Sequence, residues 1–424
     1  MCRHVCLASL FIAASLLPLS GCQSTASATT DQASSANTSS ASSASPAVTP
    51  AALTQDFAAW VADFRRQAKS EGIDAETLAA AFDSVRYLPR IIELDRSQPE
   101  FTRQVWDYLD SAVSEARISQ GRAKLTEQRE AIEAASERYG VPAEILVAIW
   151  GIESNYGGNF GSFSTIDALA TLGYDGRRPD FARSQLMAAL RILERGDISR
   201  ERMRGSWAGA MGHTQFIPTS FEAYARDADG DGRRDIWGSI ADVMASTAYY
   251  LDESGWQRGK PWGVEVRLPA DFHYAQTELS TRNSSQAWAA QGVEPVRGDG
   301  LPDFSQASVI APAGANGPAF LVGHNFRVIM RYNASTSYAL AVGLLSDRLS
   351  GQPGVVAEWP RDEPALSRSQ VKQLQTQLNA HGFEVGVPDG IIGPNTRRGL
   401  REYQRSIGEI PDGFATLDLL RQLR

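Results

Sequence analysis

The chain has 424 residues, 43% of them hydrophobic, and its 49 acidic and 41 basic side chains give a net charge of −8 at neutral pH. This length predicts two or three domains, and the composition supplies enough apolar residues for substantial cores. The acidic balance argues against a nucleic-acid-binding protein, because phosphate binding requires a concentrated basic surface.

The three cysteines lie at the extreme N-terminus, at positions 2, 6 and 22. Residues 1–21 have the order of a signal peptide: a weakly basic start, an apolar run too short to span a bilayer comfortably, and small residues. The run ends in Leu19-Ser20-Gly21-Cys22, which resembles the bacterial lipobox and implies cleavage before Cys22 and its acylation. An ordinary cleaved signal with an incidental cysteine is the alternative. Cleavage before Cys22 would leave no second cysteine for an intramolecular disulfide.

Several acyl chains on one residue anchor a protein stably, whereas a single chain holds it weakly. Gln23 follows the cysteine where some lipoproteins carry Asp, and by resemblance to enterobacterial sorting rules this favours the outer membrane. We therefore expect a periplasmic lipoprotein on the inner leaflet of that membrane. Residues 23–50 are dominated by Ser, Ala and Thr, which predicts a flexible tether, so that the lipidated cysteine and tether occupy 22–52.

From Leu53 onward apolar residues recur at helical spacing, and a first domain is assigned to 53–351. Pro142 suits the first turn of a helix, and a strongly apolar segment follows it from Ile145 to Ile152. Residues 262–310 are richer in β-branched residues, Gly and Pro, and are expected to form a small β-containing insertion. Further helices are expected at 74–83, 100–118, 126–139, 181–195, 239–252 and 335–349.

Prolines at 353, 360 and 364 mark a linker over 352–364, and a separate module is expected over 365–424. Its helices are predicted at 369–381, 394–407 and 415–423. Its core is expected to consist of Val371, Leu374, Leu378, Phe383, Leu400, Tyr403, Leu417 and Leu420. The fold class is therefore mainly α, an α+β first domain with a small β-containing insertion, followed by a three-helix module.

The segment Trp150-Gly151-Ile152-Glu153-Ser154-Asn155-Tyr156-Gly157 places an acid near the C-terminal end of the apolar helix. Burial there would disfavour the charged form of Glu153, and the negative end of the helix dipole adds to the effect. Both raise the pKa, as a general acid working near neutral pH requires. An exposed carboxylate at a helix end is the alternative.

The segment from Ser206 to Gly212, Ser-Trp-Ala-Gly-Ala-Met-Gly, runs on through Gln215 to Phe221. Its small residues permit a close approach of the backbone to a ligand, and Ser206 and Gln215 suit sugar hydroxyls and acetamides. A tight turn in helix packing is the alternative. A further segment, Arg331-Tyr332-Asn333 with Tyr338, is interpreted as the opening of a helix; a capped helix with an aromatic contact is its alternative.

Asp227-x-Asp229-x-Asp231-Gly232 matches the start of an EF-hand calcium loop, with oxygen ligands at alternate positions and glycine at the sixth. Position twelve, normally a bidentate acid, is Gly238, and Asp242 is off register. An acidic turn without metal is the alternative. The ligands expected for a structural Ca²⁺ are Asp227, Asp229, Asp231, the carbonyl of Arg233, and Asp235.

Together and in this order, the motifs resemble one family closely, the membrane-bound lytic murein transglycosylases of the B type, over about residues 53–350. Leu94-Asp95-Arg96-x-Gln98-Pro99-Glu100-Phe101 and Trp106-x-Tyr108-Leu109 belong to the same pattern. The resemblance implies a lysozyme-like catalytic core in which Glu153 is the sole acid/base. The substrate contacts that it implies are Ser206, Gln215, Tyr332, Asn333, Tyr108, Tyr250 and Tyr338.

In this family the glutamate protonates the glycosidic oxygen between N-acetylmuramic acid and N-acetylglucosamine. It then takes a proton from the C6 hydroxyl of the muramoyl residue, which attacks C1 and closes a 1,6-anhydro ring without consuming water. Ordinary glycosidases need two carboxylates, and no second acid stands in a motif comparable to that of Glu153. Intramolecular attack also has a large proximity advantage over bulk water. No cofactor is expected to be required for this reaction, and the Ca²⁺ considered above would have a structural role.

The C-terminal module resembles the peptidoglycan-binding domain 1 family, whose pattern includes Leu374-Gln375, Asp389-Gly390, Thr396, Tyr403-Gln404 and Asp412-Gly413. Peptidoglycan glycan strands are therefore the expected partner, together with the outer membrane through the lipid. Proteins of cell-wall synthesis or division are further candidate partners. For the module, a pure packing role between domains is the alternative. For the whole protein, a hydrolytic muramidase on the same fold and a non-catalytic wall-binding lipoprotein are the two alternatives.

Overall fold

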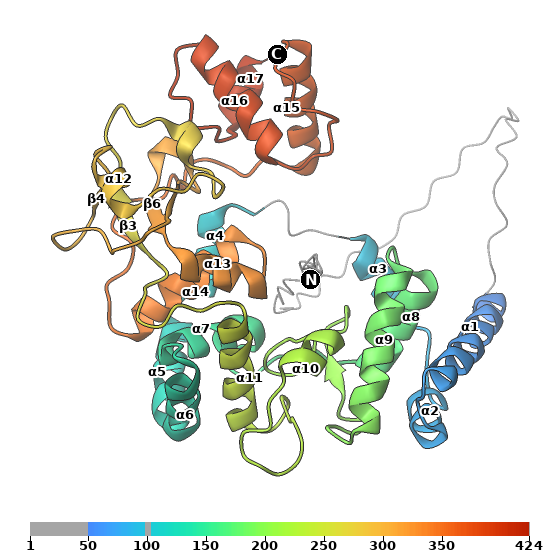
Figure 1. Cartoon of the computed structure of the whole chain (residues 1–424). Coiled ribbons are helices and arrows are strands. Elements are labelled where there is room, and N and C mark those ends of the chain that lie inside the picture. The colour runs from blue at the N-terminus through green and yellow to red at the C-terminus, as the bar shows by residue number, and fades with distance from the viewer. Residues whose placement is uncertain (1–49, 98–102, 424) are drawn as a thin grey trace, which may run out of the picture.

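The computed structural model describes residues 50–97 and 103–423 (Figure 1). The predictions of a signal peptide, of lipidation at Cys22 and of most of the tether lie outside the described residues, as does Gln98-Pro99-Glu100-Phe101. Among the residues that are described, no helix combines the length and apolar character needed to cross a bilayer.

The first part of the chain is helical, and the helices predicted at 74–83 and 126–139 are observed over Ala75–Phe82 and Arg129–Tyr139. The prediction of a single helix over 100–118 is wrong, because one helix ends at Ala112 and the next begins at Glu115. Ser114 caps α5 by accepting a hydrogen bond from the Arg117 backbone N–H, which stabilises a new helix start at this point. The helices are α1 (Pro50–Ser70), α2 (Ala75–Phe82), α3 (Pro89–Arg96), α4 (Val105–Ala112), α5 (Glu115–Glu127), α6 (Arg129–Tyr139) and α7 (Ala143–Ser154).

The middle of the chain continues with helices, and those predicted at 181–195, 239–252 and 335–349 are confirmed. The remaining helices of this part are α8 (Thr165–Asp175), α9 (Pro179–Glu194), α10 (Pro218–Tyr224), α11 (Ile240–Glu253), α12 (Ser285–Ala289), α13 (His324–Tyr332) and α14 (Thr336–Leu349). The sequence patterns missed α3, α8, α10, α12 and α13. Two short strands among these helices, β1 (Phe163–Ser164) and β2 (Arg204–Gly205), form an antiparallel pair.

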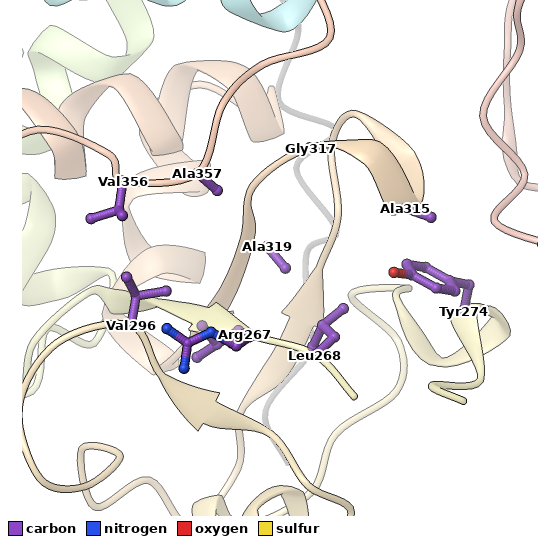
Figure 2. A pocket seen from close by; sticks show the side chains of 10 residues that line it. Arg267, Leu268, Tyr274, Val296, Ala315, Gly317, Ala319, Val356 and Ala357 are labelled. Atoms are coloured by element: carbon purple, nitrogen blue, oxygen red, sulfur yellow. The ribbon is translucent and has the colours of Figure 1, made fainter. Parts of the chain in front are cut away.

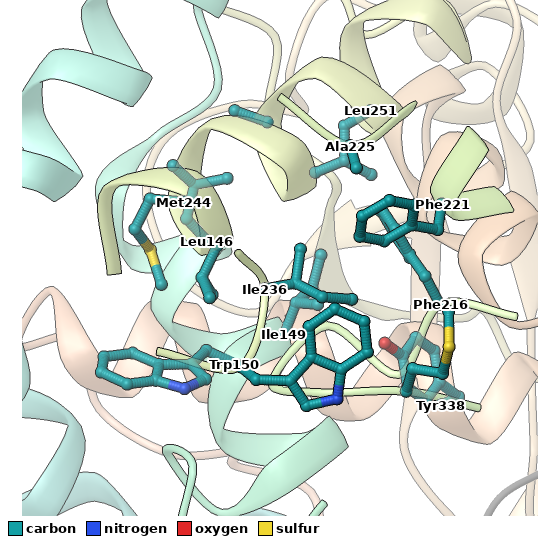
Figure 3. Packing of buried hydrophobic residues seen from close by; sticks show 14 of the residues in the cluster. Leu146, Ile149, Trp150, Phe216, Phe221, Ala225, Ile236, Met244, Leu251 and Tyr338 are labelled. Atoms are coloured by element: carbon teal, nitrogen blue, oxygen red, sulfur yellow. The ribbon is translucent and has the colours of Figure 1, made fainter. Parts of the chain in front are cut away.

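Helix α7 lies at the centre of the first domain, packed against α5, α6, α11 and α14. It is apolar on every side, and residues 145–151 are all buried, as expected for a helix surrounded by others. Figure 3 shows Leu146, Ile149 and Trp150 of this helix within the core. A helix held on all sides gives its last turn a rigid position.

The insertion forms an antiparallel sheet in the order β4-β3-β6-β5. Its strands are β3 (Gly263–Arg267), β4 (Glu294–Pro295), β5 (Ser308–Ile310) and β6 (Ala319–Val322). The predicted insertion at 262–310 was therefore too short, because β6 lies beyond it and pairs with both β3 and β5. The sheet has its own core, which includes Phe272, Trp288, Phe304, Val309 and Leu321.

The C-terminal module consists of α15 (Arg368–Ala380), α16 (Pro394–Ser406) and α17 (Leu417–Gln422), drawn in red in Figure 1. All eight residues predicted for its core belong to one hydrophobic cluster, with Phe383 and Leu417 partly buried. The Asp-Gly turns at Asp389 and Asp412 are built alike. Gln375 bonds the carboxylate of Asp389 and the N–H of Gly390, and Gln404 does the same for Asp412 and Gly413.

The segment between the two parts crosses the insertion sheet. The carboxylate of Glu265 accepts hydrogen bonds from the backbone N–H groups of Val356 and Ala357. A pocket of about 350 Å³ remains between this segment and the sheet, lined by Val266, Leu268 and Tyr274 among others (Figure 2). The linker is thus attached to the first domain before the module begins.

Candidate active site

Glu153 lies on the last turn of α7, at the end of the buried helix. Asn155 (φ 50°) and Tyr156 (φ 56°) both adopt the left-handed conformation and end the helix abruptly. Burial raises the pKa of Glu153 from 4.5 to about 7, while a hydrogen bond that the Tyr338 hydroxyl donates to Oε1 at 2.6 Å opposes the rise. The carboxyl can therefore hold a proton near neutral pH and can also release it.

Four tyrosines from four helices surround this carboxyl, namely Tyr108, Tyr250, Tyr332 and Tyr338. Burial raises the pKa of each phenol, and the negative charge of Glu153 raises it further. The Tyr332 hydroxyl donates to the carbonyl of Thr214 at 2.6 Å, and that of Tyr250 to the carbonyl of Arg331 at 2.5 Å. The fold thus brings together all the tyrosines named from the sequence, as neutral groups.

The segment Tyr332–Tyr338 does not open a single helix as predicted. Tyr332 ends α13, Asn333 caps its C-terminus, and Tyr338 lies in the first turns of α14. Asn333 is 8% exposed, and its side-chain oxygen accepts from the Ser335 N–H. The residue shapes the junction between the two helices, as the capping alternative expects, and the junction directs both tyrosines toward Glu153.

Ser206 and Gln215 shape the loop beside the tyrosines. The Ser206 hydroxyl oxygen accepts hydrogen bonds from the backbone N–H groups of Ala208 and Ala210, so this side chain stabilises the turn over residues 206–210. Gln215 has a φ of 52°, and its amide nitrogen donates to the carbonyls of Phe160 and Gly212. These contacts fix the orientation of the Gln215 side chain and leave its carbonyl oxygen as the group suited to accept from a sugar.

Sequence reasoning missed His213. Its Nδ1 accepts a hydrogen bond from Trp150 Nε1 at 3.0 Å, and its ring stacks on both Trp150 and Phe160. Burial lowers the pKa of His213, which keeps the imidazole neutral and able to accept that bond. His213 therefore joins the loop to the catalytic helix. Its position between Gly212 and Gln215 was the one signal that could have revealed it.

Tyr156 was also missed as a structural residue of the site. Its hydroxyl donates to the Arg117 carbonyl at 2.8 Å, and its ring lies over Gly151 in the helix of Glu153. A Cβ at position 151 would meet the Tyr156 ring at 2.6 Å, so glycine is required there. The contact ties the end of α7 to α5.

The acidic loop brings together a different set of carboxylates from the predicted one. Oxygens of Asp227, Asp229 and Asp242 lie within 4.8 Å of one another, so the acid judged off register completes the group. Asp231 instead pairs with Arg233, and Asp235 pairs with Arg202.

Asp242 is fully buried, and burial raises its pKa to about 6. Within the described parts of the chain, no basic side chain pairs with Asp227, Asp229 or Asp242. Three carboxylates without a basic partner fit a hard divalent cation such as Ca²⁺.

The site defines a class of enzyme. One protonatable carboxyl stands at the end of a buried helix, among tyrosines that stay neutral. In the regions that the structure describes, no second carboxylate is among the groups that shift its pKa. This arrangement is that of a lysozyme-like, glycan-cleaving enzyme.

Residues 56–347 match the transglycosylase SLT domain family, and residues 367–423 match a peptidoglycan binding domain family. The chain belongs to the SLT transglycosylase family, and it is a peptidoglycan lytic transglycosylase with a lysozyme-like catalytic fold.

Three relatives illustrate the similarity. SltB3 from Pseudomonas aeruginosa, solved with NAG-anhNAM-pentapeptide and with NAG-NAM-pentapeptide, is 52% identical at a TM-score of 0.85, over 87% of this chain and 100% of its own. Membrane-bound lytic murein transglycosylase B of Escherichia coli is 29% identical over 67% of this chain and 81% of its own. Escherichia coli Slt35 in complex with calcium is 28% identical at a TM-score of 0.58, over 70% of this chain and 92% of its own.

Proposed function

We propose that this enzyme cleaves the β-1,4 bond between N-acetylmuramic acid and N-acetylglucosamine without water, leaving 1,6-anhydro-N-acetylmuramic acid ends. The observation that carries the proposal is the single carboxyl of Glu153, whose pKa is raised to about 7 by burial. The similarity to SltB3, solved with a ligand that contains an anhydro sugar, supports the same product.

Glu153 would perform both proton transfers. Its protonated carboxyl donates to the glycosidic oxygen as the C1–O bond breaks, and the N-acetylglucosamine residue leaves as an alcohol. The resulting carboxylate then takes the proton of the C6 hydroxyl while O6 bonds to C1. The cycle returns the carboxyl to its protonated form and consumes no water, so one group is sufficient as acid and base.

The tyrosines around Glu153 would provide neutral hydroxyl groups to the sugar and exclude water. Tyr338 holds the carboxyl in one orientation, and its hydrogen bond favours the carboxylate that the second step requires. Tyr108, Tyr250 and Tyr332, with the carbonyl of Gln215, would orient the glycan. A hydrolytic muramidase would need a second base to activate water, and no such carboxylate contributes to the pKa of Glu153 within the described residues.

The products distinguish these functions. A soluble form beginning after Cys22 is expected to release muropeptides from purified sacculi that are one water lighter than hydrolytic products and resist borohydride reduction. Mass spectrometry measures both properties. Reducible products would establish the muramidase, and sacculus binding without any release would establish the non-catalytic lipoprotein.

We also propose that Cys22 is acylated and anchors the enzyme to the inner leaflet of the outer membrane. The lipobox-like segment before Cys22 and the similarity to a membrane-bound relative support this location. The Ser/Ala/Thr-rich segment would give the catalytic domain its reach toward the wall. A Cys22→Ala variant that still fractionated with membranes would contradict the anchor.

For the acidic loop, we propose that Asp227, Asp229 and Asp242 hold a structural Ca²⁺, which would neutralise the carboxylates when bound. Asp242 also accepts from the N–H groups of Ala228 and Asp235, so the ion would rigidify both ends of the loop. The calcium complex of Slt35 is consistent with this proposal. The ion would have a structural role, because the proton transfers belong to Glu153.

Calcium is expected to raise the melting temperature relative to EDTA by several degrees. Ligand at about 100 times its Kd stabilises a protein by about 2.7 kcal/mol. The rise should be lost in Asp242→Asn and retained in Asp231→Asn, because Asp231 is paired with Arg233. Differential scanning calorimetry with and without calcium measures it. Equal responses of the two variants would contradict this ligand set.

A further inference from the structure

Helix α4 presents two opposite faces to two different parts of the molecule. Tyr108 packs against the main core, which includes Trp150 and Tyr338, and α4 contacts α14, the helix that carries Tyr338. The charge of Glu153 adds to burial in raising the pKa of the Tyr108 phenol. Trp106 and Asp110, one turn apart, lie on the other side, since residues two apart in a helix point in nearly opposite directions. One short helix therefore carries an active-site tyrosine and a second, separate contact surface.

The second surface of α4 contacts the linker and the C-terminal module. Trp106 is 2% exposed. The centroid of its ring lies 6.2 Å from the ring centroid of Trp359 in the linker and 6.4 Å from that of Phe414 in the module. Arg361 of the linker forms two hydrogen bonds with the carboxylate of Asp110, at 2.6 and 2.9 Å. The position of α4 thus depends on segments at the far end of the sequence.

The turn that carries Phe414 is itself held against the insertion. The carboxylate of Asp412 accepts a hydrogen bond from the Ala315 N–H at 2.8 Å. Gly314 of the insertion has a φ of 68°, and a Cβ there would collide with Asp412 and Phe414. Glycine at this position therefore lets the turn pack closely against the insertion.

A second attachment lies nearby, where Glu278 of the insertion pairs with Arg397 and Arg401 of α16. Arg401 is buried, so this contact is more than a surface ion pair. The module is therefore docked at two places, and Phe414 extends from the docked turn to α4.

We propose that Trp106 and Phe414 are positioning residues for Tyr108, so that docking of the peptidoglycan-binding module completes the active site. The module then acts on the chemistry through α4 as well as through attachment to the wall. Two aromatic contacts and an ion pair on one face of a two-turn helix determine where its opposite face places the phenol. The inference rests on the proposed function, because it assigns Tyr108 to the substrate cleft.

Turnover of a soluble, peptide-free tetrasaccharide of the wall glycan tests this coupling, because wall attachment cannot contribute to it. Phe414→Ala and Gly314→Ala are each expected to lower kcat roughly tenfold, since small displacements of a positioning group are costly. Gly298→Ala is the matched control: Gly298 has a φ of 80° in the same insertion, with nothing within 4 Å of an added Cβ. It should keep the kcat of the wild type.

A double-mutant cycle separates positioning from general destabilisation. In a Tyr108→Ala background no phenol remains to be positioned, so Phe414→Ala should cause less than about a twofold further loss. A repeated loss of about tenfold there, or unchanged kcat in Phe414→Ala alone, would overturn the inference. In either case, anhydro products from the wild type would leave the proposed function intact, whereas their absence would refute that function itself.

Discussion

Glu153→Gln is expected to reduce turnover of purified sacculi by about 10³-fold or more, because it removes the one group assigned to both proton transfers. The amide has nearly the same shape and can accept the hydrogen bond of Tyr338, so the packing of the site should remain intact. Release of anhydro-muropeptides measures the loss. Sedimentation with sacculi should be unchanged, because the C-terminal module has its own core.

The same substitution is expected to stabilise the protein at alkaline pH. The pKa of Glu153 is about 7 in the folded protein and 4.5 ordinarily, so the native state binds more protons between these values. The stability this provides is fully present below about pH 4.5 and is lost as pH rises through 7. Glu153→Gln carries no buried charge, so at pH 8 its free energy of unfolding should exceed that of the wild type by up to on the order of 3 kcal/mol, and its melting temperature should be higher.

Glu144→Gln is the matched control, since Glu144 lies in the first turn of the same helix. It should retain wild-type turnover and show no comparable pH-dependent gain. Normal rates in Glu153→Gln would refute the catalytic assignment. Equal melting temperatures of Glu153→Gln and wild type at pH 8 would show that the carboxyl is solvated.

The second large effect is expected in the pH dependence of kcat/KM. Glycosidic cleavage starts from protonated Glu153, so kcat/KM should fall above pH 7, about tenfold for each further pH unit. Between pH 7, where half of the carboxyl is protonated, and pH 9 the loss is about fiftyfold. Initial rates on a soluble glycan fragment across this range give the profile of the free enzyme. A flat profile to pH 9 would mean that the titrating carboxyl is not the acid.

Tyr338→Phe tests whether the titrating group in this profile is Glu153. The Tyr338 hydroxyl lowers the pKa of Glu153 by donating to its carboxylate, so its removal should raise that pKa and move the alkaline limb to higher pH. The maximal rate should also fall, roughly tenfold, because a hydrogen bond to a charged group is lost. A limb displaced to lower pH would contradict the assigned direction of this hydrogen bond.

The sequence by itself determined the features that depend on neighbouring residues. The apolar run of α7 predicted a buried helix with Glu153 at its end, because a helix that is apolar on all sides must be surrounded. The core of the C-terminal module was also readable, since its helices repeat apolar residues at helical spacing. The tyrosines around Glu153 came from resemblance to a family, and no local pattern would have brought them together.

Only the tertiary structure decided which distant residues meet. Asp242 joins Asp227 and Asp229 because α11 begins beside the loop, although loop spacing alone placed it off register. The break between α4 and α5, the strand β6 and the contact of Phe414 with Trp106 have the same origin. Local spacing reports hydrogen bonds and packing within a few residues. Contacts between remote segments depend on how whole elements pack, and here that packing connects the wall-binding module to the helix of Tyr108.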